Sequence, residues 1–296
     1  MNAIYDVPAP AKLNLFLHVV GKRPDGYHLL QSVFALIDWA DTLHFEKRSD
    51  GLIQRHDQSD AELPAEDLCV RAARLLQQTT GCKLGADIHL DKRLPSGAGM
   101  GGGSSDAAST LIALNRLWDL QLKRSKLLEL ALKLGADVPF FVGGDNAWVE
   151  GIGEVLRAVE LPPMQFAVLK PRASIGTKEI FSSPLLATSQ SLAIVAGFPA
   201  HTDLGANFGR NDLQNAAEAA SEEVVQALAM LKKTFGNSRM TGSGSAVFAK
   251  VNGEKSILSQ AMATILQGAN KQAPAGWLGE ICRSLDQHPL RGWTED

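Results

Sequence analysis

The stretch Pro95-Ser96-Gly97-Ala98-Gly99-Met100-Gly101-Gly102-Gly103-Ser104-Ser105 decides how this chain is interpreted. Its glycines, five within the seven positions 97–103, remove the side chains that would keep a ligand away from the backbone. They also permit positive φ, which we expect at Gly102, so that consecutive N–H groups can converge on an anion. A helix that we predict from about Ser105 to Trp118 would add unpaired N–H donors and partial positive charge at its start. The stretch therefore predicts a polyphosphate cradle, with the hydroxyls of Ser104 and Ser105 available to phosphate oxygens or magnesium.

Two other interpretations of the stretch stay open at this point. A flexible loop that ends in a helix cap has a similar composition. Gly97, Gly99 and Gly102 also satisfy the G-x-G-x-x-G pattern of nicotinamide-dependent oxidoreductases, which needs a strand running directly into the loop. The polar run from Asp91 to Pro95 interrupts that approach, so the dinucleotide pattern is weak here. A Walker A loop is excluded, because no lysine follows the last glycine.

Outward from the loop, the N-terminal segment Val7–Val20 alternates aliphatic with other residues and reads as a strand. A period of two sends Lys12 and Asn14 to the same face. Further predicted elements are a strand pair (33–37 and 42–45), a helix (68–77), a strand (86–90), a helix capped by Ser125 and ended by Gly135, a strand (166–169), a helical stretch (216–231) and a hairpin around Gly242-Ser243-Gly244. Strands and helices without regular βαβ alternation favour a two-domain α+β fold, divided near Pro162-Pro163.

Composition limits the functional class. The chain has 296 residues, of which 45% are hydrophobic and 21% charged, with a net charge of -3. Its basic residues occur only in short groups, which argues against a nucleic-acid partner. It has no apolar run near the ~20 residues that cross a bilayer, no signal-peptide pattern, and three dispersed cysteines that suit neither a disulfide framework nor a zinc site. We therefore expect a cytoplasmic protein that acts on a small molecule.

Two further stretches carry a family resemblance. Pro10-Ala11-Lys12-Leu13-Asn14-Leu15 and Arg239-Met240-Thr241-Gly242-Ser243-Gly244-Ser245, with the glycine-rich loop between them, resemble the three motifs of the galactokinase, homoserine kinase, mevalonate kinase and phosphomevalonate kinase (GHMP) superfamily. The runs Gly21–His28, Gly135–Pro139 and Glu150–Glu154 are similar to the branch that phosphorylates diphosphocytidyl-methylerythritol. The resemblance implies an ATP-binding domain over 1–161, a ferredoxin-like domain over 162–296 and an active site between them.

The resemblance also implies a reaction and its catalytic residues. The γ-phosphate of ATP would pass to the C2 hydroxyl of the methylerythritol unit, a step of non-mevalonate isoprenoid synthesis. Asp137 would be the base, Lys12 would lie beside it, and Asn14 would hydrogen-bond the substrate. From local sequence alone, Asp137 is equally well a helix N-cap before Pro139, and a lysine on the polar face of a strand is usually just solvated.

For the substrate pocket, the resemblance places Tyr27 and His28 at the cytosine, with Phe181 on the other face of the ring. Magnesium is expected to arrive with ATP, held mainly by phosphate oxygens, so no residue is assigned to a metal. Adenine contacts are expected within residues 57–70, and the protein is expected to be a monomer or weak homodimer. Other possibilities are a homoserine or mevalonate type kinase, or a catalytically silent nucleotide-binding protein.

Overall fold

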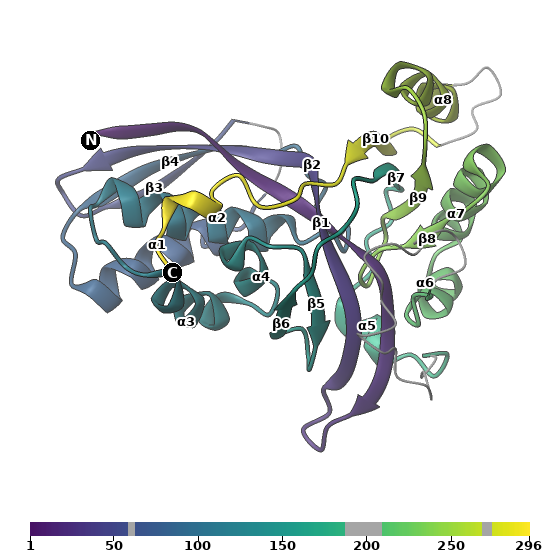
Figure 1. Cartoon of the computed structure of the whole chain (residues 1–296), viewed down its shortest axis with the longest axis horizontal. Coiled ribbons are helices and arrows are strands. Elements are labelled where there is room, and N and C mark those ends of the chain that lie inside the picture. The colour runs from purple at the N-terminus through teal and green to yellow at the C-terminus, as the bar shows by residue number, and fades with distance from the viewer. Residues whose placement is uncertain (59–62, 187–208, 268–273) are drawn as a thin grey trace.

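The computed structural model describes residues 1–58, 63–186, 209–267 and 274–296, whose strands form two sheets (Figure 1). In the first sheet the order is β3-β4-β2-β5-β6, with β1 paired to β2, and in the second it is β10-β7-β9-β8. The bounds of the first sheet are β1 (Ala3–Lys22), β2 (His28–Arg48), β3 (Ile53–Asp57), β4 (Gly85–Asp91), β5 (Ala147–Glu150) and β6 (Val155–Ala158). Those of the second are β7 (Gln165–Lys170), β8 (Arg239–Met240), β9 (Val247–Val251) and β10 (Leu278–Arg283).

Helices cover the outer faces of the two sheets, which makes this the α+β fold that the sequence predicted. One group packs on the first sheet: α1 (Leu68–Thr80), α2 (Gly102–Leu117), α3 (Arg124–Leu134) and α4 (Val138–Gly143). Another packs on the second: α6 (Gln214–Ala220), α7 (Glu222–Phe235) and α8 (Lys255–Gln267). A third core lies between the sheets. None of the helices in the described ranges combines the length and apolar content that a bilayer crossing requires.

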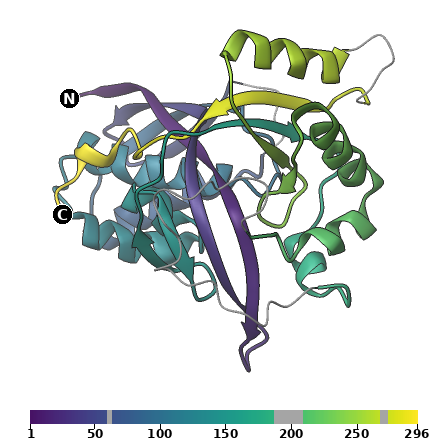
Figure 2. The same cartoon turned by 45° about the vertical axis from the view of Figure 1, so that its right-hand side comes forward.

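The antiparallel pair β1–β2 runs through the molecule and joins the two halves (Figure 2). Leu13 and Leu15 of β1 face the core between the sheets, whereas Leu17 and Val19 belong to the core of the second sheet. The change of side follows from a register shift between Asn14 and Leu17, because one extra residue exchanges the two faces of a strand. Both faces of β1 are therefore buried over its middle part.

One prediction about strands was wrong, and a predicted helical stretch is interrupted at one residue. Residues 33–37 and 42–45 belong to the single strand β2, because the polar residues between them have partners: Asp38 accepts a hydrogen bond from the Arg283 N–H, and Asp41 is buried against the segment after β4. The predicted stretch 216–231 is two helices, since Ser221 between α6 and α7 has extended backbone (φ -150°, ψ 115°).

Helix starts were also misplaced. Helix α2 begins at Gly102 rather than at Ser105, although glycine has a low helix propensity. Helix α3 begins at Arg124, and Ser125 does not cap it, because the N-cap is Lys123. Gly135 does follow α3, but in extended rather than left-handed backbone (φ 172°, ψ 160°).

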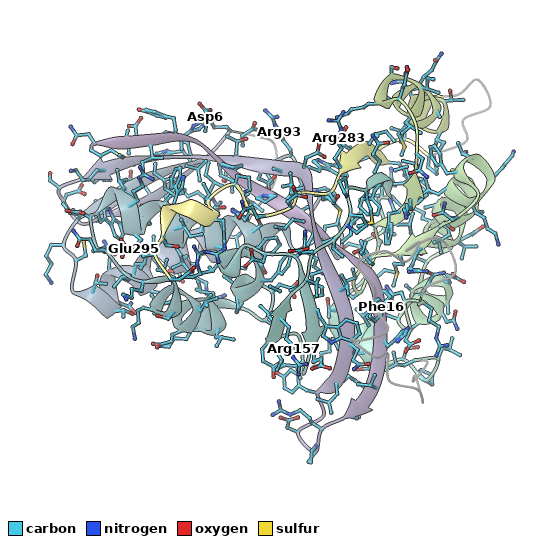
Figure 3. All side chains as sticks on the ribbon, viewed as in Figure 1. Asp6, Phe16, Arg93, Arg157, Arg283 and Glu295 are labelled. Atoms are coloured by element: carbon cyan, nitrogen blue, oxygen red, sulfur yellow. The ribbon has the colours of Figure 1, made fainter. Side chains whose placement is uncertain are left out.

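The C-terminal segment 284–296 returns to the first sheet and its helices. Arg124, which is 5% exposed, donates hydrogen bonds to the carbonyls of Val142, Arg291 and Thr294 and forms an ion pair with Asp296. The Arg124 N–H donates to the carbonyl of Glu295, which Figure 3 labels beside the helical layer. The division at 161/162 stays a prediction, with the addition that the last residues of the chain pack against elements that precede it.

We expect Arg124→Ala to lower the free energy of unfolding by about 3–5 kcal/mol, because three carbonyls and a carboxylate lose a buried partner together. Urea unfolding followed by circular dichroism measures the change. Lys126→Ala is the control, since Lys126 pairs with Glu129 in solvent and should contribute at most about 0.5 kcal/mol. Equal effects of the two substitutions would show that the tail is not held by Arg124.

Candidate active site

The three motifs meet at the backbone of β1. The Lys12 N–H donates to the carbonyl of Met100 (3.0 Å), which fixes the glycine-rich loop to β1. The Asn14 N–H donates to Thr241 Oγ1 (2.9 Å), which fixes the third motif to the same strand. Segments that lie more than two hundred residues apart in the chain therefore adjoin at β1.

The glycine-rich loop and the third motif also touch each other directly. The N–H groups of Ser245 and Ala246 donate to the carbonyls of Gly97 (3.3 Å) and Ala98 (3.2 Å). A Cβ on Gly99 would collide with the carbonyl oxygen of Thr241, so glycine is required there by a backbone contact within the protein. The third motif is thus part of the wall that shapes the loop.

Positive φ occurs at Gly97 (62°), Gly99 (71°) and Gly101 (72°). The expectation of positive φ at Gly102 was wrong, because Gly102 is already the first residue of α2. A Cβ on Gly101 would lie 2.9 Å from the Phe141 ring and 3.4 Å from Lys12 Cγ. The alternating glycines let the backbone face the cleft while Ala98 and Met100 anchor the loop in the core between the sheets.

Residues of the predicted cradle divide into two groups. Gly97, Gly99, Gly101 and Ser104 line the cleft. Ser105 does not, since it is fully buried and its hydroxyl donates to the carbonyl of Pro10 (2.6 Å). Those that also lie outside the cleft lining are Pro95, Ser96, Ala98, Met100, Gly102 and Gly103. Residues 102–104 nevertheless form the first turn of α2, whose N–H groups have no partner within the helix.

A buried ammonium group supports this loop from behind. Lys92 pairs with Asp41 of β2 and with Asp106 of α2 (2.7 Å to Asp106 Oδ2). Asp41 also accepts the N–H groups of Arg93 and Leu94 (2.6 and 2.7 Å), at the start of the loop. Burial raises the pKa of Asp106 well above its usual range, although Lys92 opposes this. Asp106 in the first turn of α2 is thus held by Lys92.

Lys12 lies in the cleft with almost no exposed surface (3%), not on a solvated face of a strand. Its Nζ donates to Asn14 Oδ1 (2.5 Å), lies 4.4 Å from the centroid of the Phe34 ring and is 3.7 Å from Asp137 Oδ2. Burial lowers the Lys12 pKa, and the nearby Asp137 carboxylate opposes this in part. The ammonium is therefore poorly solvated and available to stabilise negative charge that develops in front of it.

Asp137 occupies the N-cap position of α4, but its side chain accepts no capping hydrogen bond. Its carboxylate keeps 32% of its surface exposed and lines the cleft facing Lys12. A carboxylate in this position has a free oxygen toward the cleft, as a base needs. Asp137 thus stands at a helix start without capping it, and its role as the base stays a prediction.

Tyr27, His28 and Phe181 line the other part of this cleft, whose volume is about 1020 Å³. Phe181 ends the short helix α5 (Thr177–Phe181), and its ring stacks on that of His28 with centroids 5.3 Å apart and planes inclined by 22°. Burial and then the nearby Lys22 lower the His28 pKa, so the ring is neutral near pH 7. A neutral imidazole offers one donor and one acceptor to a ligand. Tyr27 is 60% exposed.

No role was predicted for Phe34 or for Ser32, which belongs to the family-like run Leu30-Gln31-Ser32, although both line the cleft. Ser32 Oγ accepts from Asn14 Nδ2 (2.9 Å), so Asn14 is oriented to receive Lys12. The signal that would identify both residues is the pairing of β1 with β2, where Asn14 is opposite Phe34. That register depends on bulges which no local pattern predicts.

Comparisons with known proteins agree with this geometry. A family model described as the GHMP kinases N terminal domain matches residues 67–145. A protein of Methylibium petroleiphilum, called 4-diphosphocytidyl-2-C-methyl-D-erythritol kinase, is 60% identical over 295 residues, 99% of each chain. A protein of the same name from Acidovorax ebreus is 54% identical over 298 residues, again 99% of each chain. The chain belongs to the 4-diphosphocytidyl-2-C-methyl-D-erythritol kinase family of GHMP kinases.

A solved structure of another 4-(cytidine 5'-diphospho)-2C-methyl-D-erythritol kinase superposes with a TM-score of 0.77 at 33% identity, covering 93% of this chain and 98% of that one. Membership in this kinase family implies use of ATP, and the loop fits that ligand. Positive φ at alternate glycines and the free first turn of α2 together make an anion site. Within the described ranges, His, Cys, Asp and Glu side chains form no group of three or more that could hold a metal ion. Of the range 57–70 expected at adenine, residues 59–62 lie outside the described residues.

We expect Gly101→Ala to weaken ATP binding by about tenfold or more. An alanine at φ 72° costs about 1–2 kcal/mol, and its Cβ would press on Phe141 at the cleft. Gly103→Ala is the matched control, because a Cβ there meets only Leu68 at 3.7 Å and the residue is helical. Calorimetric titration with ATP, with thermal melting to verify folding, measures both. Equal ATP affinity in the two variants would remove the loop from the nucleotide site.

Proposed function

We propose that the protein transfers the γ-phosphate of ATP to the C2 hydroxyl of 4-diphosphocytidyl-2-C-methyl-D-erythritol, giving the 2-phosphate and ADP in non-mevalonate isoprenoid synthesis. The observation that carries this proposal is the Lys12–Asp137 pair, 3.7 Å apart, in a cleft bounded by the glycine-rich loop and by the His28–Phe181 stack. The identity of 60% to a kinase of that name over the full length supports the same acceptor.

Asp137 would act as the general base. As the acceptor oxygen bonds to the γ-phosphorus and the bond to the β-phosphate oxygen breaks, the hydroxyl proton passes to the Asp137 carboxylate. Lys12 would stabilise the charge on the attacking oxygen, and Asn14 would hold Lys12 in place through its 2.5 Å hydrogen bond. A tertiary alcohol is hindered and weakly acidic, so positioning and charge stabilisation supply most of the rate.

The phosphates of ATP would lie on the loop 97–103 and on the first turn of α2, within reach of the Ser104 hydroxyl. Magnesium, bound with ATP, would neutralise phosphate charge and be held mainly by phosphate oxygens. Ser105 is left out of this proposal, because its hydroxyl already bonds to Pro10. Pro95, Ser96 and the core side chains of Ala98 and Met100 would support the loop, while the backbone of 97–103 faces the phosphates.

The cytosine would lie among Tyr27, His28 and Phe181. Aromatic faces suit a flat base, and the neutral His28 ring can meet its polar edge. One face of Phe181 is already covered by His28, so we propose that the base lies toward the exposed Tyr27. The expected state, a monomer or weak homodimer, stays a prediction. The cytoplasmic location stays a prediction.

The test of this function is consumption of ATP by the purified protein with a panel of acceptors. We expect turnover with diphosphocytidyl-methylerythritol and kcat/KM at least about 10³-fold lower with homoserine, mevalonate or galactose, since those acceptors lack the base that the aromatic residues bind. A preference for homoserine or mevalonate would instead support another kind of GHMP kinase. Protection against thermal unfolding by NADH but not by ATP would reject a kinase altogether.

We expect Asp137→Asn to lower kcat by about 10²-fold or more while the KM for ATP stays near that of the unchanged protein, as the loss of a base requires. Asp145→Asn is the control, because Asp145 lies just after α4, where it pairs with Arg291. Steady-state kinetics at saturating ATP separate the two. Retention of most activity by a folded Asp137→Asn protein would leave Asp137 with a structural role only.

A further inference from the structure

The proposed acceptor carries a diphosphate, and the residues assigned to it so far offer that group no free positive charge. Tyr27, His28 and Phe181 are aromatic. The ammonium of Lys12 is held by Asn14 and faces Asp137. A phosphate that is removed from bulk water needs charged or hydrogen-bonding partners, so the assigned site is incomplete for a nucleoside diphosphate. This reasoning rests on the function proposed above.

Two further ammonium groups line the same cleft, those of Lys22 and Lys178. Lys22 ends β1 and is the cross-strand partner of His28. Lys178 lies one turn before Phe181 in α5, and side chains at that spacing are neighbours on a helix. One lysine is therefore next to each residue of the stacked pair, Lys22 to His28 and Lys178 to Phe181.

Both lysines are exposed. In the ranges that the structure describes, neither forms an ion pair, whereas the neighbouring Arg23 is bonded to Asp25 (2.7 Å). Asp25 also lines the cleft, but that contact already balances its charge. The effect of Lys22 on His28 shows that the lysine charge reaches the ring. This end of the cleft therefore has two uncompensated positive charges beside an aromatic surface.

We propose that Lys22 and Lys178 bind the diphosphate of the acceptor, one from each side, and so select a nucleoside diphosphate derivative over an uncharged nucleoside. The stacked rings bind the base, and the two lysines hold the adjoining phosphates while the methylerythritol end reaches Lys12 and Asp137. Lysine suits this role, because its flexible stem carries a compact charge with several donors. Since both groups are exposed, each contributes a modest factor, which solvent and salt reduce.

Steady-state kinetics with the full-length chain test the proposal. Lys22→Ala and Lys178→Ala should each raise the KM for diphosphocytidyl-methylerythritol about fivefold, and the double variant about twentyfold. The KM for ATP should stay within about twofold of the unchanged protein. Lys233→Ala is the matched control, because Lys233 is an exposed lysine on α7 that does not line the cleft.

Calorimetric titration with CDP and with cytidine shows whether the two lysines bind the diphosphate or only stabilise the pocket that binds the base. The unchanged protein should bind CDP more tightly than cytidine, and this preference should fall when the salt concentration rises from 50 to 300 mM. In the double variant the preference should be about twentyfold smaller, with the affinity for cytidine unchanged. Weakening of CDP and cytidine by the same factor would assign the lysines to the base pocket and overturn the proposal.

The outcomes for the two proposals are distinct. If the unchanged protein phosphorylates the acceptor while the lysine variants keep its KM and the CDP preference, the diphosphate site is wrong and the proposed function stands. If the unchanged protein neither phosphorylates diphosphocytidyl-methylerythritol nor binds CDP or cytidine, the proposed function fails and the diphosphate site fails with it.

Discussion

The close approach of three backbone segments at the glycine-rich loop is the constraint on which the site depends. On one side the loop bonds to β1 at Lys12, and on the other to residues 245 and 246 of the third motif. Gly99 and Gly242 face each other across this contact, and a Cβ on either would meet the backbone of the opposite segment. Glycine at these positions therefore serves protein packing as well as ligand access. Because the segments are fixed to one another, Lys12 cannot move relative to the loop without breaking the contact.

Lys12 and Lys92 are both buried beside the loop, but their neighbours shift their pKa values in opposite directions. For Lys92, burial alone would lower the pKa, but Asp106 and Asp41 outweigh burial and the pKa is raised. The Lys92 ammonium therefore stays charged and holds β2 and α2 together. For Lys12, burial prevails over Asp137 and the pKa is lowered. Its partners are an amide oxygen, a ring face and one carboxylate across the cleft. Because these partners balance the Lys12 charge only in part, the ammonium can still interact with a substrate.

Sequence patterns predicted most of the helices and strands. They failed at positions whose structure depends on contacts between residues far apart in the chain. Local periodicity predicts that β1 is a strand and α1 a helix, but not the register shift at which β1 exchanges its faces. The start of α2 at Gly102 does not follow from local periodicity, since a Cβ there would be 3.2 Å from Lys92 Nζ and 3.3 Å from Leu94 Cβ. Nor does the burial of Lys12, which lies against the Phe34 ring of β2 and the backbone of Gly101. Ser105 is absent from the cleft lining for a similar reason, because its hydroxyl donates to the carbonyl of Pro10, which is far away in the sequence.

The return of the C-terminal segment has a consequence for how the chain can be made and divided. Asn146, buried before β5, donates to the carbonyls of Leu285 and Asp286, and Leu290 belongs to the core of the first sheet. The core of the first sheet is therefore incomplete until residues 285–290 have been synthesised. A nascent or truncated chain that ends near residue 161 contains the glycine-rich loop, Lys12 and Asp137, but not the segments that complete the packing around them. The N-terminal half is therefore a region of the fold that is incomplete without the last residues of the chain.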